Sequence, residues 1–162
     1  MAIKIIVTGG TIDKVYDESS GELTFTETHI MEMLEKARCE VSVSTKVLML
    51  LDSLEMDDDV RDEILNECIN CSDSQIVVTH GTDTMVETAE LLGNSVQGKT
   101  IVLLGAMIPF ALQDSDGLFN LGSAITAAQC LSPGVYITMN GKIFDWNNVR
   151  KNKEKGIFEE KY

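Results

Sequence analysis

The sequence predicts an α/β fold, in which a mostly parallel, flavodoxin-like sheet lies between helices in a three-layer αβα arrangement. Short apolar runs alternate along the chain with amphipathic stretches, which is the order expected of strand–helix–strand units. Runs such as "QIVVT" and "TIVLLG" are almost continuously apolar, as is typical of parallel strands buried on both faces. Asn140-Gly141 between β-prone flanks adds a β-hairpin near residues 136–145.

The individual elements follow from these patterns in chain order. Apolar runs predict five strands, at about residues 3–8, 41–51, 75–79, 100–105 and 134–139. Apolar residues at helical spacing predict four helices, at about 27–38, 57–70, 83–93 and 117–131. The tail from Arg150 is highly charged and is expected to be exposed, although Ile157 and Phe158 could dock on the body. No internal repeat or linker interrupts this order, so residues 1–162 are expected to form a single domain.

The composition of the chain favours some classes of binding partner over others. A chain of 162 residues with 44% hydrophobic content can bury one proper core. The 13 basic and 26 acidic residues give a formal charge of -13, which disfavours nucleic acid and anionic membranes and favours a small-molecule partner. The longest apolar run, 101–112, is too short to cross a bilayer, so no membrane partner is expected.

Cysteine usage predicts a cytoplasmic protein, and the motifs of the sequence predict neither a metal nor a cofactor. The four cysteines are too few for a secreted disulfide scaffold, so reduced thiols are expected; they are Cys39, Cys68, Cys71 and Cys130. Cys68 and Cys71 form a CxxC pair, but there is no second pair, and two histidines are too few to complete a zinc site convincingly. GxSxG, Walker and GxGxxG motifs are absent, so the lipase, nucleotide-hydrolysing and dinucleotide-binding interpretations lose their usual support.

Polar residues gather where three predicted strands end. Thr8 to Thr11 follow the first strand, Asp52-Ser53 the second, and His80 to Thr84 the third. Ligands of open α/β sheets bind at this carboxyl edge, so the three loops predict a binding site. Structural alternatives remain open for each loop: Thr11 as a turn residue, Ser53 as a helix cap, and Thr84-x-x-Glu87 as a capping box.

The sequence contains three motifs: "TGGTI" (8–12), "HGTDTM" (80–85), and "GAM.P" followed by "DG.FNL" (105–121). Both the motifs and their order resemble those of the asparaginase/glutaminase family of threonine amidohydrolases. The resemblance runs from the first strand to about Lys151 and so covers the family's N-terminal domain only. It implies hydrolysis of L-asparagine or a related small amide to the acid and ammonia, without a cofactor, by a homo-oligomer (dimer or tetramer).

The resemblance also implies roles for individual residues. Thr11 matches the first threonine, the usual candidate nucleophile, while Thr82, Asp83 and Lys151 match the family's Thr-Lys-Asp group. Ser53 and Asp83 would hold the amino-acid end of the substrate. The remaining matched positions are Gly10, Gly81 and Ala106 as substrate-binding residues and Tyr16 as the nearest candidate for the family's loop tyrosine. Without the resemblance, Lys151 would be one solvated lysine among several in the C-terminal region.

To act as the base for the threonine, Lys151 would need a strongly lowered pKa. A threonine hydroxyl needs a base, and a lysine can serve only when neutral. Lowering the reference lysine pKa of about 10.4 to near 7 requires on the order of 4 to 5 kcal/mol, and a carboxylate nearby opposes the shift.

Two residues depart from the family pattern: Leu54 and Ile108 stand where the family often has Gln and Arg. A binding module for an aspartate- or asparagine-like ligand with little or no activity, or a subunit of a larger complex, is therefore the alternative.

Overall fold

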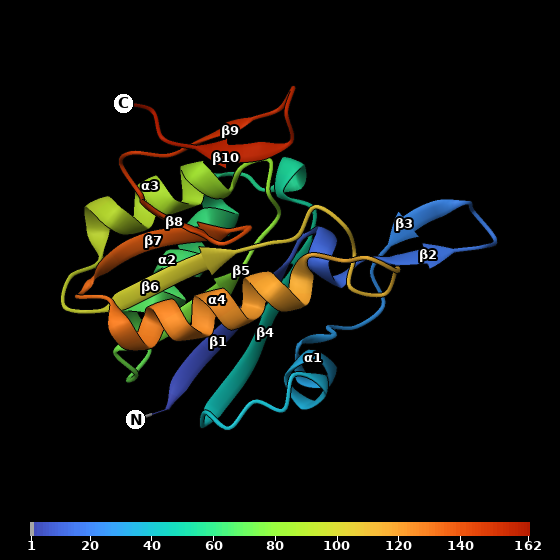
Figure 1. Ribbon diagram of the computed structural model, residues 1–162. Coiled ribbons are helices and arrows are strands. Elements are labelled where there is room, and N and C mark those ends of the chain that lie inside the picture. Colours follow the sequence, from blue (N-terminus) through green and yellow to red (C-terminus); the bar gives the residue numbers. More distant parts are fainter. Residues whose placement is uncertain (1) are drawn as a thin grey trace.

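A six-stranded sheet forms the centre of the protein in the computed structural model, which describes residues 2–162 (Figure 1). The strand order is β4-β1-β5-β6-β7-β8, and all neighbours pair in parallel except β7 and β8, which are antiparallel. The strands are β1 (Ile3–Gly9), β4 (Val43–Leu51), β5 (Gln75–Thr79), β6 (Thr100–Leu104), β7 (Gly134–Met139) and β8 (Lys142–Asp145). The five parallel strands have the order expected of a flavodoxin-like sheet, so the predicted fold class is confirmed.

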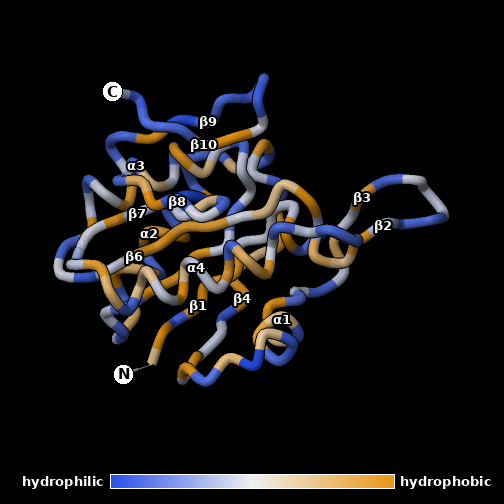
Figure 2. Tube along the Cα trace, in the orientation of Figure 1, coloured by the Kyte–Doolittle hydropathy of each residue, from blue (hydrophilic) through white to orange (hydrophobic). Residues whose placement is uncertain are grey.

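Four helices cover the two faces of the sheet. They are α1 (Ile30–Lys36), α2 (Asp58–Asn70), α3 (Met85–Ser95) and α4 (Gly117–Cys130). Alternate strand residues point to opposite faces. Ile76 and Val78 of β5 pack with α2 and α3, whereas Val77 between them packs with α1 and α4. Hydrophobic residues are accordingly concentrated in the strands of the sheet, including β1 and β6 (Figure 2).

Helix α1 is shorter than the predicted 27–38, and its surroundings explain both ends. The buried Asp13 carboxylate accepts hydrogen bonds from the Thr28 hydroxyl at 2.9 Å and from the His29 backbone N–H at 2.7 Å, which holds these two residues outside the helix. Arg38 has a positive φ of 54°, a conformation that stops the helix beyond Ala37.

The predicted hairpin joins β7 to β8. Met139 pairs with Lys142, and the two turn residues Asn140 and Gly141 have φ values of 51° and 84°. Positive φ at both positions is what a two-residue hairpin turn requires, and Asn-Gly satisfies it at little steric cost. This prediction is confirmed.

A second hairpin, which the sequence interpretation missed, follows the first strand. Strands β2 (Val15–Asp17) and β3 (Glu22–Thr24) pair antiparallel and project from the body (Figure 1). The Asp17 carboxylate closes the turn by accepting bonds from the Ser19 N–H and hydroxyl and from the Ser20 hydroxyl. Strands of three residues are too short to give an alternation that periodicity can detect.

The C-terminal tail is only partly exposed, contrary to the main expectation. Strands β9 (Arg150–Asn152) and β10 (Ile157–Glu159) form an antiparallel hairpin, and Phe158 is buried in the core beside α2 and α3. Burial of one aromatic side chain can contribute about 2–3 kcal/mol, enough to dock a short charged segment. The alternative that this tail docks through its apolar residues is correct for Phe158, while Ile157 remains exposed.

Trp146 lies just before this hairpin and packs flat on α3. A Cβ atom on Gly93 of α3 would overlap the Trp146 indole ring, so only glycine allows this close approach. The Trp146 backbone N–H donates to the Val135 carbonyl of β7 at 3.2 Å. No helix among residues 2–162 is both long enough and apolar enough to cross a membrane.

Candidate active site

The three loops predicted to converge are in direct contact at the carboxyl edge of the sheet. A Cβ atom on Gly10, whose φ is 82°, would overlap the backbone of Gly81. A Cβ atom on Gly81 would in turn overlap the Ser53 side chain. Glycine at positions 10 and 81 therefore lets the backbones of the loops after β1 and β5 touch and lets the Ser53 side chain of the loop after β4 pack directly on Gly81.

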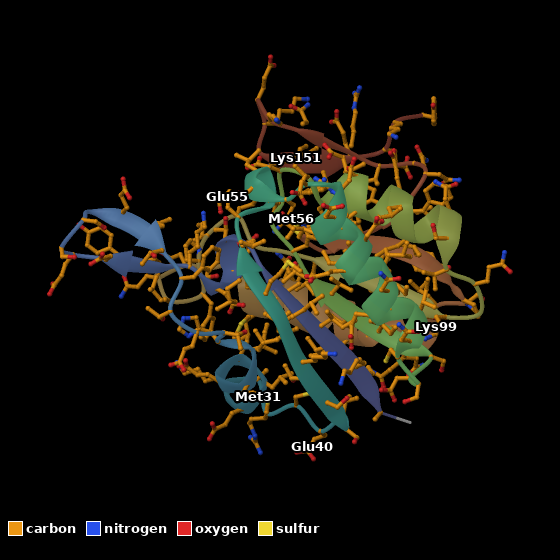
Figure 3. All side chains as sticks on the ribbon, turned by 180° about the vertical axis from the view of Figure 1, so that it is seen from behind. Met31, Glu40, Glu55, Met56, Lys99 and Lys151 are labelled. Carbon is orange, nitrogen blue, oxygen red and sulfur yellow. The ribbon has the colours of Figure 1, made fainter. Side chains whose placement is uncertain are left out.

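Lys151 reaches this edge from β9. Its Nζ atom lies 2.8 Å from Thr82 Oγ1 and 2.7 Å from Asp83 Oδ1, and only 12% of its side chain is exposed. Figure 3 shows Lys151 at the same end of the molecule as Glu55 and Met56, and opposite to Lys99 and Glu40. The docked C-terminal hairpin thus brings together three of the four residues predicted to be catalytic.

Ser53 and Thr84 join the second loop to the third. Ser53 lies in the short 3-10 helix η2 (Ser53–Glu55) and is buried. The Thr84 N–H donates to Ser53 Oγ at 3.2 Å, and the Thr84 hydroxyl donates to the Ser53 carbonyl at 2.9 Å. Ser53 Oγ keeps its own proton to donate to a ligand.

These contacts decide against two of the structural alternatives. The Thr84 side chain does not cap α3, so the capping box is not formed, and Glu87 pairs with Arg61 at 2.9 Å instead. Helix α2 is capped by Asp57, whose carboxylate accepts from the Val60 N–H at 2.9 Å, and not by Ser53.

Thr11 begins the 3-10 helix η1 (Thr11–Asp13), directly after the glycine turn. Its carbonyl accepts a hydrogen bond from the Lys14 N–H at 3.1 Å. The Lys151 Nζ donates to the Thr82 hydroxyl rather than to Thr11, and it also pairs with the Asp83 carboxylate. Thr11 therefore lies beside the Thr-Lys-Asp group through the contact of Gly10 with Gly81, without a hydrogen bond from Lys151.

The other predicted residues lie at the margin. Ala106 is buried directly after β6 and Gly105. Tyr16 lies on β2 of the projecting hairpin and is 58% exposed, so its assignment as the loop tyrosine stays a prediction. The two residues that differ from the family pattern have exposed apolar side chains: Leu54 is 67% exposed and Ile108 is 39% exposed.

The buried side chain of His80 holds the loop after β5 in place. It is fully buried, with Nδ1 2.8 Å from the Gly81 carbonyl oxygen and Nε2 2.7 Å from the Thr88 hydroxyl. Because a carbonyl can only accept, Nδ1 carries the proton and Nε2 accepts from Thr88. Burial lowers the pKa of His80 to about 4, so the ring is neutral near pH 7 and fixes the position of Gly81.

Asp116 orders the loop that contains Ala106. Its carboxylate accepts bonds from the backbone N–H groups of Met107 and Ile108 and from the Asn120 and Asn140 side chains. Burial alone would raise the pKa of Asp116, but these hydrogen bonds outweigh it and leave the pKa below its usual value. The "DG.FNL" motif thus holds the "GAM.P" loop in place.

Comparison with known proteins identifies the family. The model of the asparaginase N-terminal domain matches residues 2–158. The chain belongs to the asparaginase family. It is 31% identical to the glutaminase-asparaginase of Acinetobacter glutaminasificans, covering 92% of this chain and 49% of that protein. It is also 31% identical to one of the subunits of the glutamyl-tRNA(Gln) amidotransferase of Methanococcus vannielii, covering 88% of this chain and 35% of that protein.

Solved structures agree with this assignment. The thermostable L-asparaginase from Thermococcus kodakarensis superposes with a TM-score of 0.84 at 27% identity, over 99% of this chain and 51% of that structure. The chain thus spans about half the length of the asparaginases it matches. The resemblance seen in the three motifs is confirmed.

Two features of this asparaginase-family site were missed by sequence reasoning. Lys14 pairs with Asp52, and His80 supports Gly81. Asp52 stood directly before Ser53 in the sequence, but nothing in the sequence indicated which lysine would approach it. Within residues 2–162 no group of three or more His, Cys, Asp or Glu side chains is arranged to hold a metal ion.

Proposed function

We propose that this chain is an asparaginase-like amidohydrolase that converts L-asparagine or a related small amide to the acid and ammonia. The observation that supports this most is the contact of Lys151 with both Thr82 and Asp83 beside the glycine turn that leads to Thr11. A hydroxyl, a lysine and a carboxylate at the carboxyl edge of the sheet are the groups needed for acyl transfer through threonine.

In the proposed reaction the Thr11 hydroxyl oxygen attacks the amide carbon, and the hydroxyl proton passes to the amide nitrogen. The C–N bond breaks and the nitrogen leaves as ammonia. Water then hydrolyses the acyl-threonine ester, which gives the acid and restores the Thr11 hydroxyl. Backbone N–H groups of the glycine turns stabilise the oxyanion. The substrate amino group binds the Asp83 carboxylate, which is also the partner of Lys151.

Ammonia release from asparagine, glutamine and small amides tests this proposal. Replacing the nucleophile, Thr11→Ala, is expected to lower kcat by several orders of magnitude. Thr82→Ala removes the hydroxyl bonded to Lys151 and should also cost activity, whereas Thr126→Ala on the exposed face of α4 serves as the control. Absence of ammonia release by the unaltered protein at high concentration contradicts the proposal.

A ligand-binding module or a component of a larger complex is the second candidate. Two observations favour it: Leu54 and Ile108 place apolar side chains where the family often has polar ones, and one relative is part of an amidotransferase. Such a module would be stabilised by aspartate or asparagine in proportion to ln(1 + [L]/Kd), without turnover. Unchanged melting temperatures with every small amide and dicarboxylate would count against it.

A homo-oligomer, dimer or tetramer, is proposed to cover the site. Exposed apolar side chains on the projecting β2–β3 hairpin and on the segments after β4 and β6 support this: Tyr16, Leu23, Leu54, Ile108 and Leu112. Light scattering coupled to gel filtration measures the oligomeric state, and Leu54→Glu should shift it toward the monomer. We also propose a cytoplasmic location, which the four free cysteines support.

A further inference from the structure

Lys14 connects two of the loops that build the site. It lies directly after η1, at the base of the β2–β3 hairpin, and its Nζ atom is 2.5 Å from Asp52 Oδ2 in the loop after β4. Its backbone N–H donates to the Thr11 carbonyl at 3.1 Å. One residue is thus bonded through its backbone to Thr11 and through its side chain to the neighbour of Ser53.

Asp52 extends this connection to the rest of the site. Its second oxygen, Oδ1, accepts from the Leu54 N–H at 3.0 Å and so caps η2. Ser53, inside η2, is joined to Thr84 by two hydrogen bonds. The pair therefore completes a continuous chain of contacts from Thr11 to the loop that carries Thr82 and Asp83.

The pair is better placed to act than an ordinary surface ion pair. The Lys14 and Asp52 side chains are only 16% and 32% exposed, so water and salt screen them less than they screen a fully exposed pair. The hydrogen bond from Lys14 is the main reason that the pKa of Asp52 lies below its usual value. On the far side of η1, Asp13 is held by Thr28 and His29, so Lys14 supplies the anchor on the side of Ser53.

We propose that Lys14, through Asp52, is a positioning residue that fixes Thr11 relative to Ser53. This inference rests on the proposed function, because it assigns Lys14 a part in the reaction of Thr11. The pair holds η1 against the second loop while the hairpin that begins at Val15 extends away from the body (Figure 1). Without the pair, the first turn after Gly10 is free to move with the hairpin.

Steady-state kinetics of four variants test the effect on the reaction. Lys14→Met removes the charge but keeps an apolar stem near the Phe25 ring, and Asp52→Asn keeps the acceptor for Leu54. Each is expected to lower kcat by about 10- to 100-fold, the cost of misplacing a reacting group by about 1 Å, with KM changed less than about threefold. Lys14→Arg should restore part of kcat. The kcat of the double variant Lys14→Met/Asp52→Asn should be no lower than that of the slower single variant, since each substitution removes the same ion pair.

Lys46→Met is the matched control. It removes an ion pair of similar length, 2.6 Å to Glu67, from a part of β4 distant from the loops, and kcat should not change. A Lys14→Met enzyme with unaltered kcat, or one whose loss lies only in KM, overturns the positioning role while leaving the proposed function intact.

Hydrogen exchange gives a readout that does not depend on turnover. The amides of Asp13 and Lys14 donate to the carbonyls of Gly10 and Thr11, both at 3.1 Å. Their protection should fall by about tenfold or more in Lys14→Met and remain unchanged in Lys46→Met. Unchanged protection overturns the proposal. If protection falls but no variant or parent protein releases ammonia, the anchoring of Thr11 is established and the proposed function is what fails.

Discussion

His80 is the residue whose protonation matters most for the shape of the site. It is uncharged because it is buried, and its Nδ1–H donates to the carbonyl of Gly81, the residue that touches both Gly10 and Ser53, while Nε2 accepts from the Thr88 hydroxyl. A proton on Nε2 would take the acceptor away from the Thr88 hydroxyl and put a charge in the core. The third loop therefore depends on a neutral imidazole.

Stability should consequently fall as the pH drops. The pKa of His80 is about 4 in the folded protein against 6.5 for an unperturbed histidine, so the unfolded chain takes up the proton first. The contribution of neutral His80 to the free energy of unfolding is complete above pH 6.5. It is lost progressively between pH 6.5 and 4, by about 3 kcal/mol. Urea unfolding across this range, compared with a His80→Gln variant, measures it. Equal pH slopes for the two proteins would contradict this prediction.

Among the secondary-structure elements, the long apolar strands could be predicted from sequence, whereas the short hairpins could not. Strands β5 and β6 are buried on both faces, so nearly every residue carries the signal. The β2–β3 hairpin and the start of α1 depend on local side-chain bonds of Asp17, Thr28 and Asp13, which leave no periodic pattern. Docking of β9 and β10 depends on one aromatic residue, Phe158, within a charged segment.

The C-terminus of α2 offers a prediction at this scale. Lys99, just before β6, donates from Nζ to the carbonyls of Cys68 at 2.7 Å, Ile69 at 3.1 Å and Cys71. A cation at the negative end of a helix satisfies carbonyls that the helix leaves free. Lys99→Met should lower the free energy of unfolding by about 1–2 kcal/mol in a urea titration. Lys153→Met in the exposed β9–β10 turn is the control, and equal losses in both variants would argue against the capping role.

For the whole molecule, the excess of 13 negative charges sets the response to salt. Like charges repel most in the compact state, and this repulsion is screened within about 10 Å at 0.1 M salt. Raising NaCl from about 0.05 to about 0.5 M at pH 7 should therefore raise the melting temperature, by about 2–4 °C if roughly 1 kcal/mol is regained. The effect should shrink near pH 4, where many carboxylates are protonated. A melting temperature that falls with salt would show that ion pairs outweigh the repulsion.

The site could be predicted in part because its loops follow long strands. The carboxyl edge of a parallel sheet collects whatever comes after each strand, so Thr11, Ser53 and Thr82 could be placed together from the order of elements. Lys151 could not, since it arrives on a hairpin whose docking depends on tertiary packing; only the family resemblance singled it out. Lys14 was missed because its partner, Asp52, lies on a different loop, and contacts between loops leave no pattern in the spacing of residues along the sequence.

Trp146 gives this protein a built-in optical probe. It is the single tryptophan of the chain and lies five residues before Lys151. Its indole ring packs against Gly93 of α3. Its fluorescence should therefore report whether the segment that delivers the lysine is seated on α3, without any label. Solvent relaxation around an undocked indole would move the emission to longer wavelengths, so the same sample used for ammonia assays can show when the lysine has left the site.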